Sequence, residues 1–168
     1  MPCKLSQSLQ LKEFRMSITL KAIGRVHSSR SEVRDDYWDE EECFIELCED
    51  FDEEALYGLG DFSHAEVIFF VDQVSPDKIV KTASHPRGRK DWPKIGIFAQ
   101  RGKNRPNQIG LTICKIKKIE GKRLYLRGLD AVHGSQILDI KPWVEEFGPR
   151  GPHAQPEWIS ELMKNYWS

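Results

Sequence analysis

The residue types best suited to chemistry gather in one loop, within the run IGIFAQRGKNRPNQIGL at residues 95–111. Arg101, Lys103 and Arg105 place cations in a turn that also contains glycine, proline and asparagine. Guanidinium groups pair well with carboxylates and phosphates, so this loop predicts contact with an anionic ligand. The same composition also fits a solvated connection between two strands.

A second run, GLDAVHGSQILDIKPW at residues 128–143, joins a turn containing His133 and Gly134 to a short strand. Asp130 and Asp139 stand too far apart in the sequence to indicate a catalytic pair of carboxylates. We therefore assign no catalytic residue from the sequence.

The common metal and nucleotide motifs are missing from the sequence. Its cysteines, Cys3, Cys43, Cys48 and Cys114, have no CxxC spacing, so we expect no metal site. Cys43 and Cys114 lie in apolar runs and are expected in the core. There is no GxxxxGK[ST] loop and no GxGxxG turn, which argues against the Rossmann-like architecture of most methyltransferases.

The formal net charge of -1 conceals a strong segregation of charge. Residues 32–77 are rich in acids and contain the single base Arg34, whereas residues 78–127 are rich in bases and contain only Asp91 and Glu120 as acids. The basic half could form a phosphate-binding face. Alternatively, the two halves could pair with each other in the fold.

These side chains must be positioned by short strands. Apolar runs recur between turn signals at residues 18–26, 43–48, 67–74, 94–99, 109–119, 123–129 and 137–140. Their spacing predicts a mainly β fold, a single antiparallel β-barrel. The clearest hairpin joins residues 112–119 to 123–127 through the turn 120–122, with Thr112 and Cys114 on one face and Ile113 on the other.

A C-terminal helix is expected from about residue 156, where Pro156 precedes Trp158, Ile159, Leu162 and Tyr166 at helical spacing. Its apolar stripe predicts core packing or a dimer contact. Residues 1–15 are expected to be a disordered extension, Met16 offers an alternative start, and residues 16–168 form the barrel domain. No apolar stretch suits a membrane span or a signal peptide, which favours the cytoplasm.

The two runs described above resemble the TrmO/YaeB family of tRNA methyltransferases, also called VirR or TsaA-like. The shared features are the FAxR turn, the RPN loop ending in Gly-Leu, the DxxxG turn and the LDIKP stretch, and the likeness covers roughly residues 18–141. The C-terminal tail and residues 86–93 look closer to the short VirR-like branch. Departures are Gln108 for a proline, His133 for an acid and Asp72 for a histidine.

The resemblance implies that S-adenosylmethionine binds in the β-barrel of a homodimer, near the subunit boundary. Carried over by position, the cofactor-binding residues fall into four sets. They are Arg101 with Leu111; the turn Ala131, Val132, His133, Gly134; the segment Asp36, Tyr37, Trp38; and the pair Asp72, Gln73.

By the same resemblance, the acceptor is N6-threonylcarbamoyladenosine beside the tRNA anticodon. Cations and aromatic side chains suit the phosphates and splayed bases of such a loop. The candidates for nucleic-acid binding are Arg105, Lys103, Arg87, Arg89 and Lys90. We expect this chain to lack the extra C-terminal domain of the long enzymes, so two alternatives stay open: a regulatory module that binds S-adenosylmethionine, and a methyltransferase for another acceptor.

Overall fold

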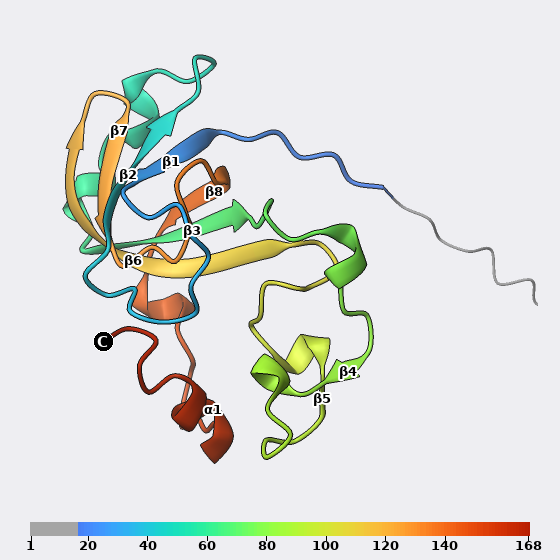
Figure 1. Cartoon of the computed structure of the whole chain (residues 1–168). Coiled ribbons are helices and arrows are strands. Elements are labelled where there is room, and N and C mark those ends of the chain that lie inside the picture. Colours follow the sequence, from blue (N-terminus) through green and yellow to red (C-terminus); the bar gives the residue numbers. More distant parts are fainter. Residues whose placement is uncertain (1–16) are drawn as a thin grey trace, which may run out of the picture.

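The computed structural model describes residues 17–168, and most of its strands close into one antiparallel barrel (Figure 1). The barrel order is β1-β2-β7-β6-β3-β8, and β1 pairs with β8 to close the ring. The strands are β1 (Gly24–Ser28), β2 (Glu42–Leu47), β3 (His64–Phe70), β6 (Ile109–Glu120), β7 (Arg123–Arg127) and β8 (Gln136–Pro142). The predicted barrel fold is confirmed. The predicted extension at residues 1–15 lies outside the described residues.

Alternation along each strand builds the core. In β7, Leu124 and Leu126 are fully buried while Tyr125 between them faces outward, as the period of two requires. Ile45 and Val67 fill the same interior from β2 and β3. The register must hold, since a slip of one residue would turn these side chains to the surface.

The predicted hairpin is confirmed in β6 and β7. Its turn contains Gly121, whose φ of 56° lies in the left-handed region that glycine adopts without strain. Cys114 is buried, as is Cys43 on β2, whereas Ile113 is exposed on the outer face. A bulge between Ile116 and Lys118 shifts the register against β7.

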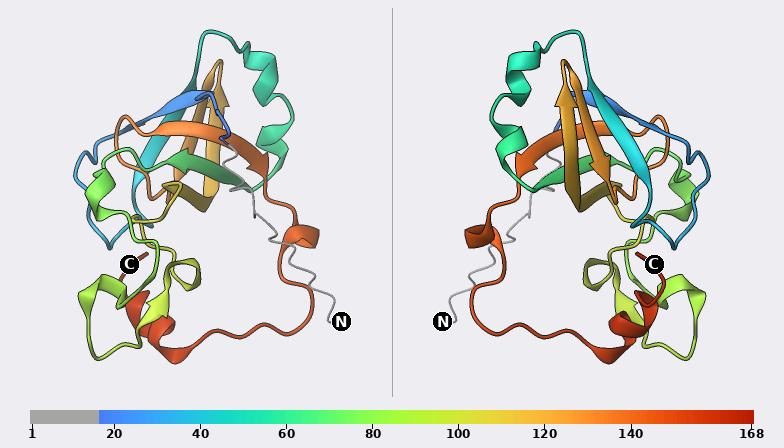
Figure 2. Two further views of the ribbon diagram at one scale, coloured as in Figure 1. Left: turned by 90° about the vertical axis from the view of Figure 1, so that its right-hand side faces the viewer. Right: turned by 90° about the vertical axis from the view of Figure 1, so that its left-hand side faces the viewer.

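A small lobe, residues 76–105, hangs below the barrel beside the C-terminal segment (Figures 1 and 2). It contains the two-residue strands β4 (Ala83–Ser84) and β5 (Ile95–Gly96) and the 3-10 turns η3 (Pro76–Lys78), η4 (Pro86–Gly88) and η5 (Ile97–Ala99). The prediction of one strand over residues 94–99 is therefore wrong after Gly96. The chain turns there because Ile97 is buried and the side-chain amide of Gln100 donates to the Ser84 and Ile95 carbonyls.

The remaining 3-10 turns decorate the barrel: η1 (Glu53–Leu56), η2 (Leu59–Asp61) and η6 (Glu145–Phe147). The predicted C-terminal helix is α1 (Glu157–Leu162), and it is shorter than its apolar spacing suggested. It packs on the lobe: Trp158 meets Trp92 with ring centroids 6.5 Å apart, and the Trp92 indole donates to Glu161 at 2.8 Å. Beyond α1, the amides of residues 37–39 donate to the carbonyls of residues 165–167.

Candidate functional site

A carboxylate from the turn between β7 and β8 stands at the centre of the candidate site. Asp130 follows the buried Leu129, and its oxygens accept hydrogen bonds from the Thr112 and Tyr166 hydroxyls. Thr112 comes from β6 and Tyr166 from the segment after α1, so three distant parts of the chain meet here. We call Asp130, Thr112 and Tyr166 the Asp130 cluster.

The electrostatics of the cluster keep Tyr166 protonated. Burial is the largest cause that raises the pKa of the Tyr166 phenol, and the charge of Asp130 and its hydrogen bond add to the rise. The charge of Arg101 acts in the opposite direction. Tyr166 therefore acts as a hydrogen-bond donor to Asp130 at neutral pH.

Arg30 ties the 36–38 loop to the 131–134 turn. Its guanidinium lies 3.4 Å from the Trp38 ring centroid and donates to the Asp36 and Tyr37 carbonyls at 3.0 Å each. Its own carbonyl accepts from the His133 amide at 2.8 Å. Burial lowers the pKa of Arg30, partly offset by Glu41, and its Nε is buried without a partner among the described residues.

The 36–38 loop is also strained. Tyr37 has a φ of 66°, which is uncommon for a residue with a side chain, and its ring is 65% exposed. Such conformations persist where surrounding contacts impose them, often at ligand sites. Here the backbone bonds to the C-terminal segment and to Arg30 hold Tyr37 in place.

The cation-rich loop folds back on β6. Arg101 donates from Nη2 to the Leu111 carbonyl at 2.6 Å, which joins two residues that the sequence assigned to the cofactor. Arg105 donates from Nη1 to the Gln100 carbonyl at 3.1 Å, within its own loop. The loop is thus a braced structure rather than a free connection.

The 131–134 turn offers mainly backbone to a ligand. Ala131 and Val132 are buried, 2% and 7% exposed, and Ala131 belongs to the barrel core. His133 is exposed, and Gly134 has a φ of 88° with open space where a Cβ would stand. Only His133 of these four can present a side chain to solvent.

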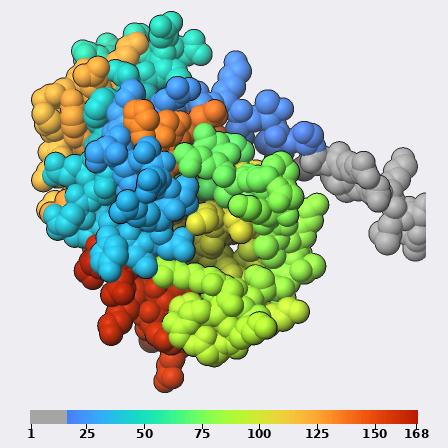
Figure 3. All heavy atoms as spheres, in the orientation of Figure 1, coloured from blue at the N-terminus to red at the C-terminus, as the bar shows by residue number. Residues whose placement is uncertain are grey.

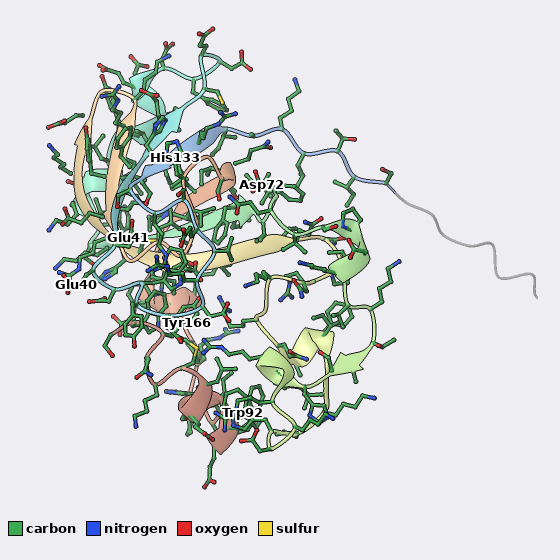
Figure 4. All side chains as sticks on the ribbon, viewed as in Figure 1. Glu40, Glu41, Asp72, Trp92, His133 and Tyr166 are labelled. Atoms are coloured by element: carbon green, nitrogen blue, oxygen red, sulfur yellow. The ribbon has the colours of Figure 1, made fainter. Side chains whose placement is uncertain are left out.

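Asp72 and Gln73 are not brought to this cluster within one chain. Both are exposed in the turn that follows β3, and Figure 4 shows Asp72 well apart from Tyr166. Figure 4 also shows Tyr166 between His133 on the barrel and Trp92 in the lobe. A hollow on this face is bordered by the blue chain near residue 30 and by green and yellow segments (Figure 3).

Several cations predicted to bind nucleic acid are paired with acids in the fold. Arg87 donates to both oxygens of Asp36, at 2.7 and 3.1 Å, and Lys103 contacts Asp35 at 3.0 Å. Arg89 pairs with an acid in the lobe and another in α1. Further ion pairs lie on the outer surface of the barrel: Lys117 with Glu42, Arg123 with Glu46, and Arg127 with Asp39 and Glu40. The acidic and basic halves of the sequence therefore do pair with each other.

Lys90 is exposed, and Arg105 is half-buried beside Gln100. Within residues 17–168, no cluster of three or more side chains suits a metal ion. Nor does that part of the chain hold a helix of the length and apolar character that a membrane crossing needs.

Sequence reasoning missed Arg30 and the Asp130 cluster. Asp130 lies inside the DxxxG turn that carried the family likeness, yet its partners are distant in sequence. Tyr166 was interpreted as part of an apolar helical stripe, although α1 ends before it. No local sequence pattern predicts the contact between the barrel turn that contains Asp130 and the segment after α1 that contains Tyr166.

Comparisons with known proteins agree with the predicted family. The family model described as tRNA-methyltransferase O N-terminal domain matches residues 27–148. A human tRNA (adenine(37)-N6)-methyltransferase is 39% identical over 95 residues, 56% of this chain and 21% of that protein. An S-adenosyl-L-methionine-binding protein of Archaeoglobus fulgidus is 37% identical over 98 residues, 57% of this chain and 67% of that protein.

A crystal structure of TrmO from Pseudomonas aeruginosa superposes with a TM-score of 0.68 at 29% sequence identity. The match covers 83% of this chain and 61% of that one, and the alignment with the human protein spans only about a fifth of its length. The structural superposition and the family match therefore point to the same family. This chain therefore belongs to the family of the tRNA-methyltransferase O N-terminal domain.

Proposed function

We propose that this protein binds S-adenosylmethionine beside the Asp130 cluster and methylates N6 of an adenine in tRNA. One observation carries the proposal: Arg30 bonds to both the 36–38 loop and the 131–134 turn, and Lys103, in the same loop as Arg101, contacts Asp35 beside the 36–38 loop. Those are the segments expected to hold the cofactor. The names of the human and archaeal relatives support the same activity and the same ligand.

The residues present fit such a cofactor. Arg101 uses one amino group on Leu111, so its other N–H groups can bind the carboxylate of the methionine end. The exposed Tyr37 ring suits a sulfonium cation, and Leu111 gives an apolar wall for the adenine. The bound cofactor supplies an electrophilic methyl group, and the chain's own task is to orient the acceptor nitrogen in line with it.

Asp130 is the group best placed to act on the acceptor. Its carboxylate is fixed by two hydroxyl donors and can accept a hydrogen bond from an exocyclic N–H. We propose a positioning role, in which Asp130 turns the acceptor nitrogen toward the methyl group, and the proton that this nitrogen loses on methylation passes to solvent. For the acceptor itself we propose N6-threonylcarbamoyladenosine next to the anticodon.

The position of Asp72 and Gln73 supports a homodimer as part of this proposal. Both residues are exposed, and Asp72 lies well apart from Tyr166 in one chain (Figure 4), so a second copy would have to supply this pair to the same cofactor. Light scattering should then give about twice the 19.5 kDa of one chain. A monomer that binds the cofactor at full affinity would remove this part of the proposal.

A second candidate is a module that only binds S-adenosylmethionine. It is favoured by the archaeal relative, whose name records binding and no transfer. Both candidates require that S-adenosylmethionine binds, and calorimetry tests this binding. A folded protein that gives no heat of binding refutes both candidates.

The acceptor is tested with bulk tRNA prepared with and without the threonylcarbamoyl modification. Nucleosides are then analysed by mass spectrometry after incubation with protein and cofactor. We expect a methylated product only from the modified tRNA. Binding without methylation of either tRNA would favour the binding module, and methylation of both would refute the proposed acceptor.

A further inference from the structure

Residues 157–168, which we call the C-terminal strap, lie across the candidate site. The strap begins with α1, in which Glu161 accepts from the Trp92 indole at 2.8 Å and pairs with Arg89 at 3.2 Å. Trp158 of α1 also meets the Trp92 ring, with centroids 6.5 Å apart. These contacts anchor the first half of the strap on the lobe.

The second half of the strap covers the Asp130 cluster. The Tyr166 hydroxyl donates to Asp130, and Trp167 meets the Tyr166 ring edge-on, with centroids 5.0 Å apart. The carbonyls of residues 165–167 accept from the amides of residues 37–39. The strap therefore occupies the carboxylate to which we assign the acceptor, and it also holds the neighbouring loop.

An exposed tether, residues 149–156, joins the strap to the barrel. Every residue of the tether is exposed, and no described residue accepts a hydrogen bond from a tether amide. Figure 2 shows the tether running clear of the barrel between η6 and α1. The strap itself contains no fully buried residue. Segments with few buried contacts open at low free-energy cost, so the strap is well suited to leave the site while the barrel stays folded.

The Tyr166 ring offers Asp130 what the proposed acceptor would offer. Tyr166 presents a planar ring with one donor at its edge, the phenol hydroxyl. The base of N6-threonylcarbamoyladenosine is also planar, and its N6 carries the single hydrogen that methylation replaces. Asp130 keeps its hydrogen bond from Thr112 in either case. The acceptor base and the Tyr166 ring would therefore compete for one oxygen of the same carboxylate.

We propose that the acceptor base binds Asp130 in the place that the Tyr166 ring occupies, after the C-terminal strap has swung away on its tether. This inference rests on the proposed function, since it assigns a subsite to the RNA that is methylated. RNA then binds only the open form, so its observed affinity is lowered in proportion to the fraction of molecules that are open. The free protein keeps its acceptor site closed until RNA arrives.

The first test weakens the strap at α1, away from Asp130. Glu161→Ala removes the carboxylate that holds Trp92 and Arg89, and alanine suits a helix. The RNA is a synthetic anticodon stem-loop with N6-threonylcarbamoyladenosine at the acceptor position. Glu161→Ala should bind it about 3- to 30-fold more tightly than wild type does, because more molecules are open.

Glu157→Ala is the matched control for the change in charge. It removes one acid from the same helix, but Glu157 is exposed in the first turn and takes no part in the contacts of Glu161. A gain in RNA affinity that came only from a lost negative charge would appear equally in both variants. We expect Glu157→Ala to bind the stem-loop like wild type.

Tyr166→Phe tests the competition at Asp130 itself. The variant keeps the ring but removes the hydroxyl, so RNA should bind about 3- to 30-fold more tightly. A tyrosine with only a structural role would instead lose RNA affinity along with stability. An abasic site at the acceptor position removes the base that exchanges with Tyr166. Wild type, Glu161→Ala and Tyr166→Phe should therefore bind the abasic stem-loop with equal affinity.

Hydrogen exchange measures opening of the strap without RNA. The amides of residues 37–39 should exchange faster in Glu161→Ala than in wild type or Glu157→Ala, because their acceptors lie on the strap. Faster exchange without a gain in RNA affinity would show that the strap opens but does not compete with RNA. That result, no gain in either variant, or an equal gain on the abasic stem-loop would overturn the proposal.

Failure of the proposed function would look different. Wild type that transfers no methyl group, while both variants gain affinity for the stem-loop, would leave the subsite standing and refute the transfer. Methylation by wild type with unchanged RNA affinity in both variants would overturn the subsite and leave the proposed function standing. A protein that binds neither the stem-loop nor S-adenosylmethionine would refute both.

Discussion

Replacing Tyr166 with phenylalanine should destabilise the protein, although it removes a single oxygen atom. The hydroxyl donates to the Asp130 carboxylate in a half-buried setting, and Thr112 supplies the carboxylate's other side-chain donor. Hydrogen bonds to charged groups contribute about 1.5–3 kcal/mol, so we expect a loss of that size in the free energy of unfolding. Urea denaturation near neutral pH measures it.

Tyr57→Phe is the matched control for this prediction. The Tyr57 hydroxyl donates to Glu53 at 3.2 Å, which is also a tyrosine–carboxylate pair, but Tyr57, directly after η1, is 69% exposed. Water replaces such a bond at little cost, so this variant should unfold like wild type. Equal losses in both variants, or none in Tyr166→Phe, would refute the argument that burial makes the Tyr166 bond strong.

The pH dependence gives the same prediction an independent test. Because the folded pKa of Tyr166 is raised above that of a free tyrosine, about 10, its contribution is complete below that pH. The contribution is then lost as the pH rises through the folded value. The stability gap between wild type and Tyr166→Phe should therefore narrow above about pH 10, and a gap that widens would have the wrong sign.

Three further outcomes are expected from the structure. Gly24→Ala should cost about 1–3 kcal/mol of stability by urea denaturation, since an added Cβ would stand 2.7 Å from a carbonyl of the next strand; Gly96→Ala, with open space, should cost less. Burial raises the pKa of Cys43 to about 12, so stability should fall as pH rises above about 8.5, the free-thiol value, and Cys43→Ala should show a shallower fall. By calorimetry, Arg101→Ala should weaken S-adenosylmethionine by roughly 1.5–3 kcal/mol, whereas Arg105→Ala, which loses a bond within its loop, should keep most of the affinity.

Much of the barrel could be predicted because its determinants are local. Alternation in β6 and β7 and a glycine at the turn specify a hairpin, and the burial of Cys43 and Cys114 follows from the same period. The alternation of residues could not predict that the strand within the apolar run 94–99 ends at Gly96. Its turn depends on Gln100, whose amide reaches back to Ser84, and a period of two carries no information about that contact.

For a related reason, only part of the candidate site could be predicted from the sequence. Of the segments that the family likeness selected, all but the pair Asp72, Gln73 are linked to one another by contacts in the structure, but the groups Arg30, Asp130 and Tyr166, which join them, were not selected. Each acts through a contact with a distant part of the chain. Asp130 and Tyr166 are separated by 36 residues, a distance at which neither helical nor strand periodicity relates two side chains.

The segregation of charge along the sequence allowed two interpretations: a phosphate-binding face, or pairing between the acidic and basic halves. The ion pairs in the structure bear on both. Arg87 and Lys103, candidates for tRNA phosphates, are held by Asp36 and Asp35 at the edge of the 36–38 loop. A phosphate that binds either cation must compete with these carboxylates, and release of Asp36 from Arg87 would remove one of the contacts that hold the loop that presents Tyr37. If the proposed function is correct, RNA binding and the cofactor loop share the same acids, so the two ligands should alter each other's affinity by equal factors.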